Sequence, residues 1–405
     1  MSENRQPRKL NTGGARKQTS QNAPQQRRIS TQHSSQGSSV PGGAAQPAAR
    51  AARRSPWKPV IAVLLILALV LGGLYWWVVH SISPGGGTPS IPELIRTPSE
   101  FKGDVVNVLV CGIDYEEGRG YGNDGDSNDG MTDMIMYVSF DVANKKISMM
   151  QIPRNVVVGD KAPASNGQIN SVALTGGGIA ALAQTINDQL KLPVDEWVSI
   201  DMESLRKVVD VFGGVWVTVP HDIEYAGSRI EQGYRKLDGA AAEFFVRNRK
   251  GEGYSNSDLD RLMMQRYFYQ GLLRELREMT VWDAAKMVPV ACSYVKTSMP
   301  TSTIVSLAVS LLKVDSADIM LCRMPVYQAA QYYNGNSVVV ADAVGTADLL
   351  NQYFRTYGGP VPAEELDLFS WPTSGAPFDP SIQFMGQLDT EGQQAQQDAG
   401  IEELD

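Results

Sequence analysis

The chain has 405 residues and a formal net charge of −8, which is divided unevenly along the sequence. Residues 1–58 hold 11 Lys and Arg and one acid, so they carry +10 and the remainder carries −18. A basic nucleic-acid-binding fold needs its cationic surface on the folded part, which argues against that class. No Cys/His spacing suits zinc, and His221 has no triad partners around it. Cys111 is expected in a buried strand, whereas Cys292 and Cys322 could pair in an oxidising exterior or stay free.

The N-terminal part has the pattern of a membrane anchor. Residues 1–56 are rich in Gln, Ser, Ala, Pro and Arg, which indicates a disordered basic tail. The 20 residues at 60–79 carry no charge, so 57–80 is predicted to be a transmembrane helix. The positive charges before it place the N-terminus in the cytoplasm and the main domain outside the cell membrane. The alternative is a cleaved signal peptide, for which the charged leader is too long. Residues 81–103 are expected to be a linker.

The segment 104–370 alternates between strand-like and helix-like runs and is predicted to be one extracellular domain. Strand patterns cover 105–111, 134–140, 146–152, 197–201, 215–219 and 318–324. Helix patterns cover 179–190, 203–211, 239–245, 259–278, 281–294, 303–312 and 341–355. The interleaving predicts an α/β fold whose sheet is covered by helices on both faces. Residues 371–405 contain no Lys or Arg and are predicted to be an acidic, disordered tail.

Two aspartates lie at the ends of neighbouring predicted strands. Asp114 follows the first strand, and Asp133 lies where the second begins. Carboxylates at adjacent strand ends can share one hard cation, so the two are predicted to bind Mg²⁺. The alternative is that they are turn or cap residues. The loop 123–129 between them is rich in Asp and Asn but lacks the spaced Glu of an EF-hand, which favours a solvated loop over a calcium site.

Cationic and polar side chains gather in two further segments. They are Arg154, Arg247, Arg249, Arg261 and Gln265. Arg154 would project beside the aspartates if the strands pair in sequence order. Arg247 and Arg249 point the same way if 246–250 is extended, and Arg261 and Gln265 share a helix face at i, i+4. Guanidinium forks suit phosphate oxygens, so Arg247, Arg249 and Arg261 are predicted to bind phosphate. The alternative is a salt-bridged acidic surface.

Taken in order, these motifs resemble the LytR-CpsA-Psr family over roughly residues 104 to 330. The motifs are Asn-Val-Leu-Val-Cys-Gly-Ile-Asp at 107–114, Thr-Asp at 132–133, Ile-Pro-Arg at 152–154, Gln-Ile-Asn at 168–170, Phe-Gly-Gly-Val at 212–215, Leu-Asp-Gly at 237–239, Val-Arg-Asn-Arg at 246–249, and Asp258, Arg261 and Gln265. Each motif alone is weak, but the ordered set is specific, and the predicted anchor agrees with it.

The resemblance implies a three-layer α/β/α sandwich with a central mixed β-sheet, after one transmembrane helix, that encloses an apolar groove for a polyprenyl chain. Such proteins transfer a glycopolymer from a polyprenyl-pyrophosphate carrier in the membrane lipid to peptidoglycan during cell wall biogenesis, with Mg²⁺ as cofactor. By motif position, the metal ligands are Asp114 and Asp133. The residues that would bind the diphosphate or steady that site are Arg154, Arg247, Arg249, Arg261 and Gln265. The catalytic residues are Arg154, Asp133 and Asp258, with either aspartate as proton acceptor.

The chain departs from the family pattern at four positions. Met131, Asn155, Gln168 and Met264 stand where the family usually has Arg, Asp, Lys and Arg. These losses of charge favour a second hypothesis, a non-catalytic protein that binds lipid-linked polymer or senses the wall. The retained aspartates and arginines favour the phosphotransferase. A pyrophosphatase that uses water as acceptor is a third, weaker hypothesis.

Overall fold

A computed structural model describes residues 105–114, 130–162, 166–174, 177–251, 254 and 258–398. The predicted basic tail, transmembrane helix, linker and 123–129 loop all lie outside these residues. Within the described part of the chain, no helix has both the length and the hydropathy of a membrane span.

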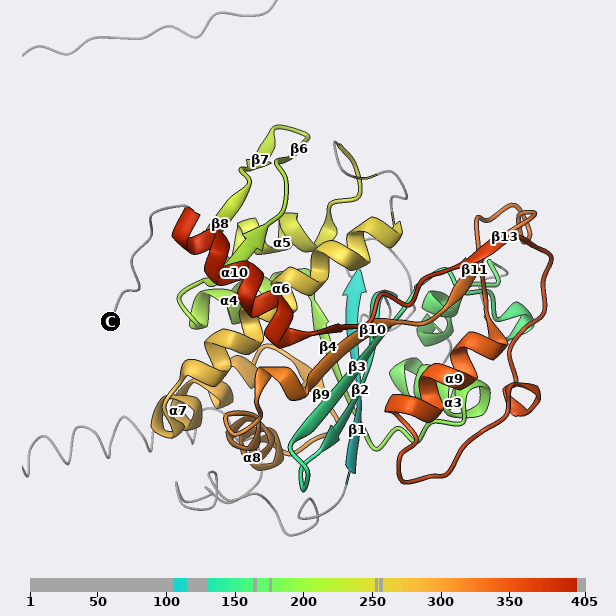
Figure 1. Cartoon of the computed structure of the whole chain (residues 1–405), viewed down its shortest axis with the longest axis horizontal. Coiled ribbons are helices and arrows are strands. Elements are labelled where there is room, and N and C mark those ends of the chain that lie inside the picture. Colours follow the sequence, from blue (N-terminus) through green and yellow to red (C-terminus); the bar gives the residue numbers. More distant parts are fainter. Residues whose placement is uncertain are drawn as a thin grey trace, which may run out of the picture. The chain divides into compact units, whose positions relative to one another are not determined.

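A seven-stranded mixed sheet forms the centre of the fold, in the order β14-β10-β3-β2-β1-β4-β9 (Figure 1). Its strands are β1 (Val105–Asp114), β2 (Met131–Asp141), β3 (Lys146–Ile152), β4 (Glu196–Asp201), β9 (Lys296–Thr297), β10 (Ile319–Arg323) and β14 (Gln383–Phe384). Strand β1 runs parallel to β4, and β3 runs parallel to β10, whereas β2 is antiparallel to both of its neighbours. Consequently β1, β3, β4 and β10 all end at one edge of the sheet, where β2 begins. We call this the C-terminal edge.

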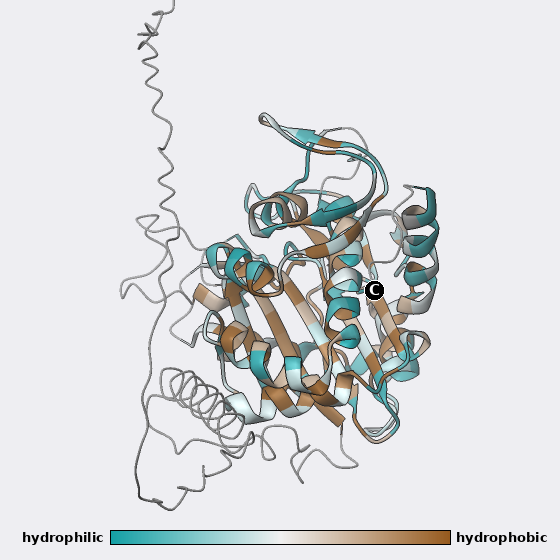
Figure 2. Ribbon diagram, turned by 90° about the vertical axis from the view of Figure 1, so that its left-hand side faces the viewer, coloured by the Kyte–Doolittle hydropathy of each residue, from teal (hydrophilic) through white to brown (hydrophobic). Residues whose placement is uncertain are grey.

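Helices cover both faces of the sheet, as predicted. One face packs against α3 (Gly178–Leu190) and α9 (Ala343–Tyr353), and the other against α6 (Asp258–Glu278) and α8 (Thr301–Leu311) (Figure 1). Successive strand residues point to opposite faces. In β2, Ile135 joins the apolar cluster under α3, and Met136 joins the cluster under α6. Figure 2 shows the resulting concentration of hydrophobic residues on the strands.

A second apolar cluster forms between α6 and a small antiparallel ladder outside the central sheet. The ladder pairs β5 (Val215–Val219) with β8 (Gly233–Leu237) and lies among α4 (Met202–Val211), α5 (Gly239–Arg247) and α6. The hairpin of β6 (Ile223–Tyr225) and β7 (Ser228–Ile230) extends from it, and α7 (Val281–Cys292) packs on α8. The strand predicted at 215–219 therefore exists but belongs to this ladder.

The prediction of a disordered tail from residue 371 is wrong for residues 371–398. Strand β13 (Thr373–Phe378) pairs with β11 (Val326–Ala329), which also pairs with β12 (Val339–Ala341), and β14 pairs with β10. Helix α10 (Met385–Asp398) buries Met385 and Leu388 under the sheet. The acidic composition did not reveal this order. Backbone ladders and the buried side chains of Met385 and Leu388 hold the segment in place, and neither requires a long hydrophobic run.

The three cysteines are free. Cys111 is fully buried in β1, as predicted, and Cys322 is fully buried in β10. The alternative of a disulfide between Cys292 and Cys322 is not realised, and burial raises the pKa of the Cys292 thiol to about 12.

A buried arginine connects α6, β3 and the C-terminal segment. The Arg266 Nε donates to Gln151 Oε1 at 2.9 Å, and Gln151 Nε2 donates to the Leu262 carbonyl at 2.8 Å. The Arg266 Nη1 donates to the Ser381 carbonyl and, at 3.0 Å, to Gln383 Oε1. Burial lowers the pKa of Arg266 to about 10, which leaves it charged at neutral pH. Its neutral acceptors therefore solvate a cation that water cannot reach.

Replacing Arg266 with Met keeps most of the apolar contact but leaves buried acceptors without donors. We expect Arg266→Met to lower the free energy of unfolding by about 2–4 kcal/mol, measured by urea denaturation of the full-length chain. Hydrogen exchange should quicken in residues 371–398. The control is Arg277→Met on the same helix. Arg277 donates to the Val314 carbonyl at 3.1 Å and lies 3.6 Å from Asp389, so about 1 kcal/mol or less should be lost. Equal losses in the two variants would contradict the assignment.

Candidate functional site

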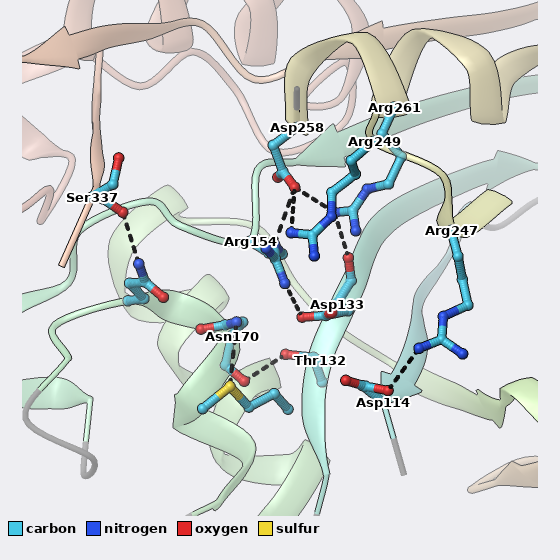
Figure 3. Close-up of polar contacts among 12 residues, drawn as sticks. Asp114, Thr132, Asp133, Arg154, Asn170, Arg247, Arg249, Asp258, Arg261 and Ser337 are labelled. Atoms are coloured by element: carbon cyan, nitrogen blue, oxygen red, sulfur yellow. Dashed lines mark hydrogen bonds and ion pairs between the residues drawn. The ribbon is translucent and has the colours of Figure 1, made fainter. Parts of the chain in front are cut away.

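Polar side chains from several elements meet at the C-terminal edge of the sheet (Figure 3). Strand β1 ends at Asp114, and Asp133 lies near the start of β2. The β1–β2 register passes from Met134 to Thr132 and skips Asp133, which is therefore the extra residue of a β-bulge. Bulges re-aim side chains at the rims of sheets. The bulge thus turns Asp133 away from the regular alternation at the point where β3 ends.

Arg154 lies beside Asp133, as the order of the strands predicts. It follows Pro153 at the end of β3, and its Nη1 lies 2.6 Å from Asp133 Oδ1. Its Nε lies 3.2 Å from Asp258 Oδ1. Burial on its own lowers the pKa of Arg154, but Asp258 and Asp133 more than compensate, so the net shift is upward. Arg154 therefore remains cationic throughout the working range of pH.

Asp258 is the centre of the arrangement. It is the first residue of α6, and its Oδ1 lies 3.2 Å from Arg154 Nε, 3.6 Å from Arg249 Nη1 and 3.1 Å from Arg261 Nη2 (Figure 3). Both carboxylate oxygens are shielded from solvent, and within the described part of the chain neither accepts a well-aligned hydrogen bond. One carboxylate thus holds three guanidinium groups by ion pairing from three separate segments.

Arg261 and Gln265 share a face of α6 but have different partners. Arg261 is 4% exposed, and its Nη2 also donates to the Asp133 carbonyl at 3.1 Å, which ties α6 to β2. Burial lowers the pKa of Arg261, against the opposing effect of Asp258.

Gln265 donates to the Val246 carbonyl at 2.9 Å and accepts from Tyr269 Oη at 3.1 Å. The buried amide of Gln265 therefore braces the backbone beside Arg247, and direct binding of diphosphate by Gln265 stays a prediction.

Arg247 and Arg249 diverge, contrary to the prediction that they point the same way. Arg247 is still helical as the last residue of α5, and the backbone becomes extended only at Asn248. The Arg247 side chain contacts Glu243 at 2.8 Å and lies 3.7 Å from Asp114, whereas Arg249 turns toward Asp258 (Figure 3). Both side chains are about half exposed, so they form the rim of the site.

A cleft of about 410 Å³ opens beside the arginines. Its lining residues are Arg154, Asn155, Gln168, Arg249, Asp258, Leu259, Gln328, Ser337, Val339 and Phe378. The last four come from the β11–β13 region, which the sequence did not mark as part of a site. Phe378 lies in the segment predicted to be disordered, and no signal in the sequence could have placed it here. Glu243, by contrast, could have been found from its i, i+4 spacing to Arg247.

The two carboxylates of Asp114 and Asp133 suit Mg²⁺ only if a phosphate ligand also binds the ion. Asp114 and Asp133 come from neighbouring strands, and no group of three or more His, Cys, Asp or Glu gathers as a metal site among the residues that the structure describes. Mg²⁺ is usually held by one or two carboxylates, with substrate phosphates and water completing the shell. The two aspartates fit that pattern, although each also faces an arginine.

The four departures from the family pattern lie outside the arginine–aspartate cluster. Met264 is 5% exposed and packs in the apolar cluster of α5 and α6. Met131 contacts the Asn170 amide, with 3.7 Å from Nδ2 to Sδ. Asn155 and Gln168 line the cleft, and the Gln168 Nε2 donates to the Ser337 carbonyl at 2.8 Å. The lost charges therefore change the surroundings of the cluster and leave its own ion pairs in place.

Comparison with known proteins places the chain in a family. The profile of the LytR_cpsA_psr family matches residues 93–354. A Bacillus subtilis protein named polyisoprenyl-teichoic acid–peptidoglycan teichoic acid transferase TagU is 26% identical over 53% of this chain and 68% of its own length. The Oceanobacillus iheyensis protein of the same name is 25% identical over 58% of this chain and 75% of its own length.

Solved structures agree on the fold. The crystal structure of Bacillus subtilis TagV covers 66% of this chain and all of its own, with a TM-score of 0.52 and 22% identity. An Enterococcus faecalis protein described as a transcriptional regulator covers 65% of this chain and 92% of its own, with a TM-score of 0.51 and 20% identity. Since the family profile matches more than half of the sequence, the chain belongs to the LytR_cpsA_psr family.

Proposed function

We propose that this protein is a membrane-anchored, Mg²⁺-dependent phosphotransferase that moves a glycopolymer from a polyprenyl-pyrophosphate carrier to peptidoglycan. The observation that carries the proposal is the convergence of Arg154, Arg249 and Arg261 on Asp258, with Arg154 and Arg249 lining the cleft. Guanidinium forks are well suited to phosphate oxygens. The names of the TagU relatives supply the substrate class, a polyisoprenyl-linked polymer and a peptidoglycan acceptor.

Positioning and charge stabilisation carry most of the work in phosphoryl transfer, and this site is arranged for both. Arg154 and Arg249 hold the diphosphate oxygens in the cleft while Asp258 fixes the two guanidinium groups. A peptidoglycan hydroxyl attacks the phosphorus that carries the sugar, the bridging P–O bond breaks, and polyprenyl phosphate leaves. We assign the hydroxyl proton to Asp133, because the oxygens of Asp258 are shielded from solvent.

The charge balance of the site supports a divalent cation. The four arginines of the site, Arg154, Arg247, Arg249 and Arg261, face four carboxylates, Asp114, Asp133, Asp258 and Glu243. Within the described residues these side chains therefore supply no net positive charge for an anionic diphosphate. Mg²⁺ held by Asp114, Asp133 and the diphosphate would neutralise that charge.

The second candidate, a non-catalytic binder of lipid-linked polymer, also has an observation in its favour. Each of the four arginines of the site already has a carboxylate partner. The charges of the site are therefore balanced before any ligand binds, and an arrangement of this kind can hold a ligand without reacting with it. The two candidates differ in what happens to a bound carrier. A catalyst breaks the diphosphate and releases polyprenyl phosphate, whereas a binder retains the intact lipid.

Turnover of a labelled carrier separates these candidates. We expect the full-length chain, incubated with Mg²⁺, peptidoglycan and a labelled polyprenyl-pyrophosphate saccharide, to release polyprenyl phosphate and attach the saccharide covalently to peptidoglycan. Chromatography of the lipid and wall fractions measures both products. Tight binding without release would identify a binder. Release without attachment, unchanged by adding peptidoglycan, would identify a pyrophosphatase.

Arg154 is the residue on which the proposal is tested most directly. We expect Arg154→Ala to reduce the transfer rate by about 10²- to 10³-fold, because one preorganised charge at the transition state is lost. Arg235→Ala is the matched control, since Arg235 bonds to neighbours on the exposed β7–β8 turn and does not line the cleft. The rate of the control should be unchanged. A fall of less than threefold in Arg154→Ala would refute the assigned role.

The metal prediction has a readout that does not depend on turnover. We expect Mn²⁺, a spectroscopic substitute for Mg²⁺, to bind the full-length chain with inorganic pyrophosphate, as followed by electron paramagnetic resonance. The double variant Asp114→Asn and Asp133→Asn should weaken this binding by tenfold or more, because both anionic ligands are lost. Asp283→Asn, an exposed N-terminal residue of α7, serves as the control. Unchanged Mn²⁺ affinity in the double variant would remove these aspartates as ligands.

A further inference from the structure

The polar residues that line the cleft beside the arginines form two chemically different sets. One set is charged and consists of Arg154, Arg249 and Asp258. The other set, which we call the amide wall, consists of Asn155, Gln168, Gln328 and Ser337. All four residues of the amide wall are polar and uncharged, and the apolar side chains of Leu259, Val339 and Phe378 complete the lining. A single cleft therefore combines groups that bind anions with uncharged groups that form hydrogen bonds.

Backbone ladders hold the amide wall in place. Gln328 in β11 pairs with Val339 of β12 on one side and with Ser374 of β13 on the other. The Val339 N–H in turn donates to the Asn155 carbonyl at 3.0 Å, which connects this sheet to the segment that follows Arg154. Gln328 is thus fixed in a paired strand, and a backbone hydrogen bond fixes Asn155 beside it, so the backbone needs little ordering when a ligand arrives.

Two carboxamides of the amide wall have no internal partner. The side chains of Asn155 and Gln328 make no hydrogen bond to any other residue that the structure describes, whereas the Gln168 amide already donates to the Ser337 carbonyl. Each free carboxamide offers two N–H donors and one acceptor oxygen. They can pair with groups that both donate and accept, which is the behaviour of sugar hydroxyls.

The same wall is poorly suited to a second phosphate. Among the described lining residues, Arg154 and Arg249 are the only cations, and neither belongs to the amide wall. Phe378 instead presents an aromatic surface against which the apolar face of a sugar ring can pack. The cleft volume of about 410 Å³ is within the range of small-molecule sites. Its chemistry therefore fits a diphosphate together with an uncharged saccharide.

We propose that the amide wall binds an uncharged saccharide next to the diphosphate and makes Asn155 and Gln328 specificity-determining residues. This inference rests on the proposed function for the identity of the neighbouring diphosphate. The saccharide has two possible sources with the same chemistry, the first sugars of the lipid-linked donor and the glycan strand of the acceptor.

Three binding titrations of the full-length chain test the proposal without relying on turnover. The probes are a polyprenyl diphosphate without sugar, the same lipid carrying an uncharged disaccharide, and soluble uncross-linked glycan strands. The variant is the double substitution Asn155→Ala and Gln328→Ala. Gln331→Ala is the control, because Gln331 is an exposed glutamine just beyond β11 that does not line the cleft. Thermal melting of each variant confirms that it is folded.

We expect the double variant to bind the sugar-free lipid within twofold of the unaltered chain. Its affinity for one sugar-bearing probe should fall by tenfold or more, since each lost hydrogen bond contributes about fivefold. Loss confined to the disaccharide lipid identifies the donor as the source, and loss confined to the glycan strands identifies the acceptor. Equal weakening of the sugar-free lipid, or no change with any probe, overturns the proposal. These titrations measure binding alone, so they test the proposal even if the transfer assay shows no catalysis.

Discussion

The ion pairing of one carboxylate with three guanidinium groups is the constraint on which the rest of the site depends. Arg154, Arg249 and Arg261 would repel one another if Asp258 did not lie between them. Because both oxygens of Asp258 are shielded from water, its attraction for the three cations is weakened less by solvent than a surface ion pair would be. The position of the first turn of α6 therefore determines where the cationic groups stand.

The support of that turn extends through the whole domain. Arg261 attaches α6 to β2, Gln265 attaches it to the end of α5, and Arg266 attaches it to β3 and to the segment before α10. Three side chains within six residues thus connect the cluster to elements far apart in the sequence. An enzyme that works by electrostatic preorganisation needs this rigidity, since its charges must be in place before the reaction begins. The C-terminal segment is part of the support and also contributes Phe378 to the cleft.

Much of the fold could be predicted because its signals are local. Strands β1, β2 and β3 are apolar runs, and the helices have amphipathic periods, so their existence follows from residues a few positions apart. The proximity of Arg154 to Asp133 followed from pairing the strands in order. Other features depend on partners that no local pattern reveals. The bulge at Asp133, the divergence of Arg247 and Arg249, and the commitment of Gln265 to Val246 are of this kind.

By itself, the sequence determined the class of fold, the family and the charged residues available at the candidate site. Ordered motifs and local periodicity can be read directly from the order of the residues. Only the tertiary structure decided which of those residues meet. It placed Asp258 at the centre, paired Gln265 with the Val246 carbonyl, and ordered residues 371–398 through ladders with β10 and β11. The physical reason is that ion pairs and strand ladders form between residues that are close in space. The separation of two residues in the sequence does not show whether they are close in the fold.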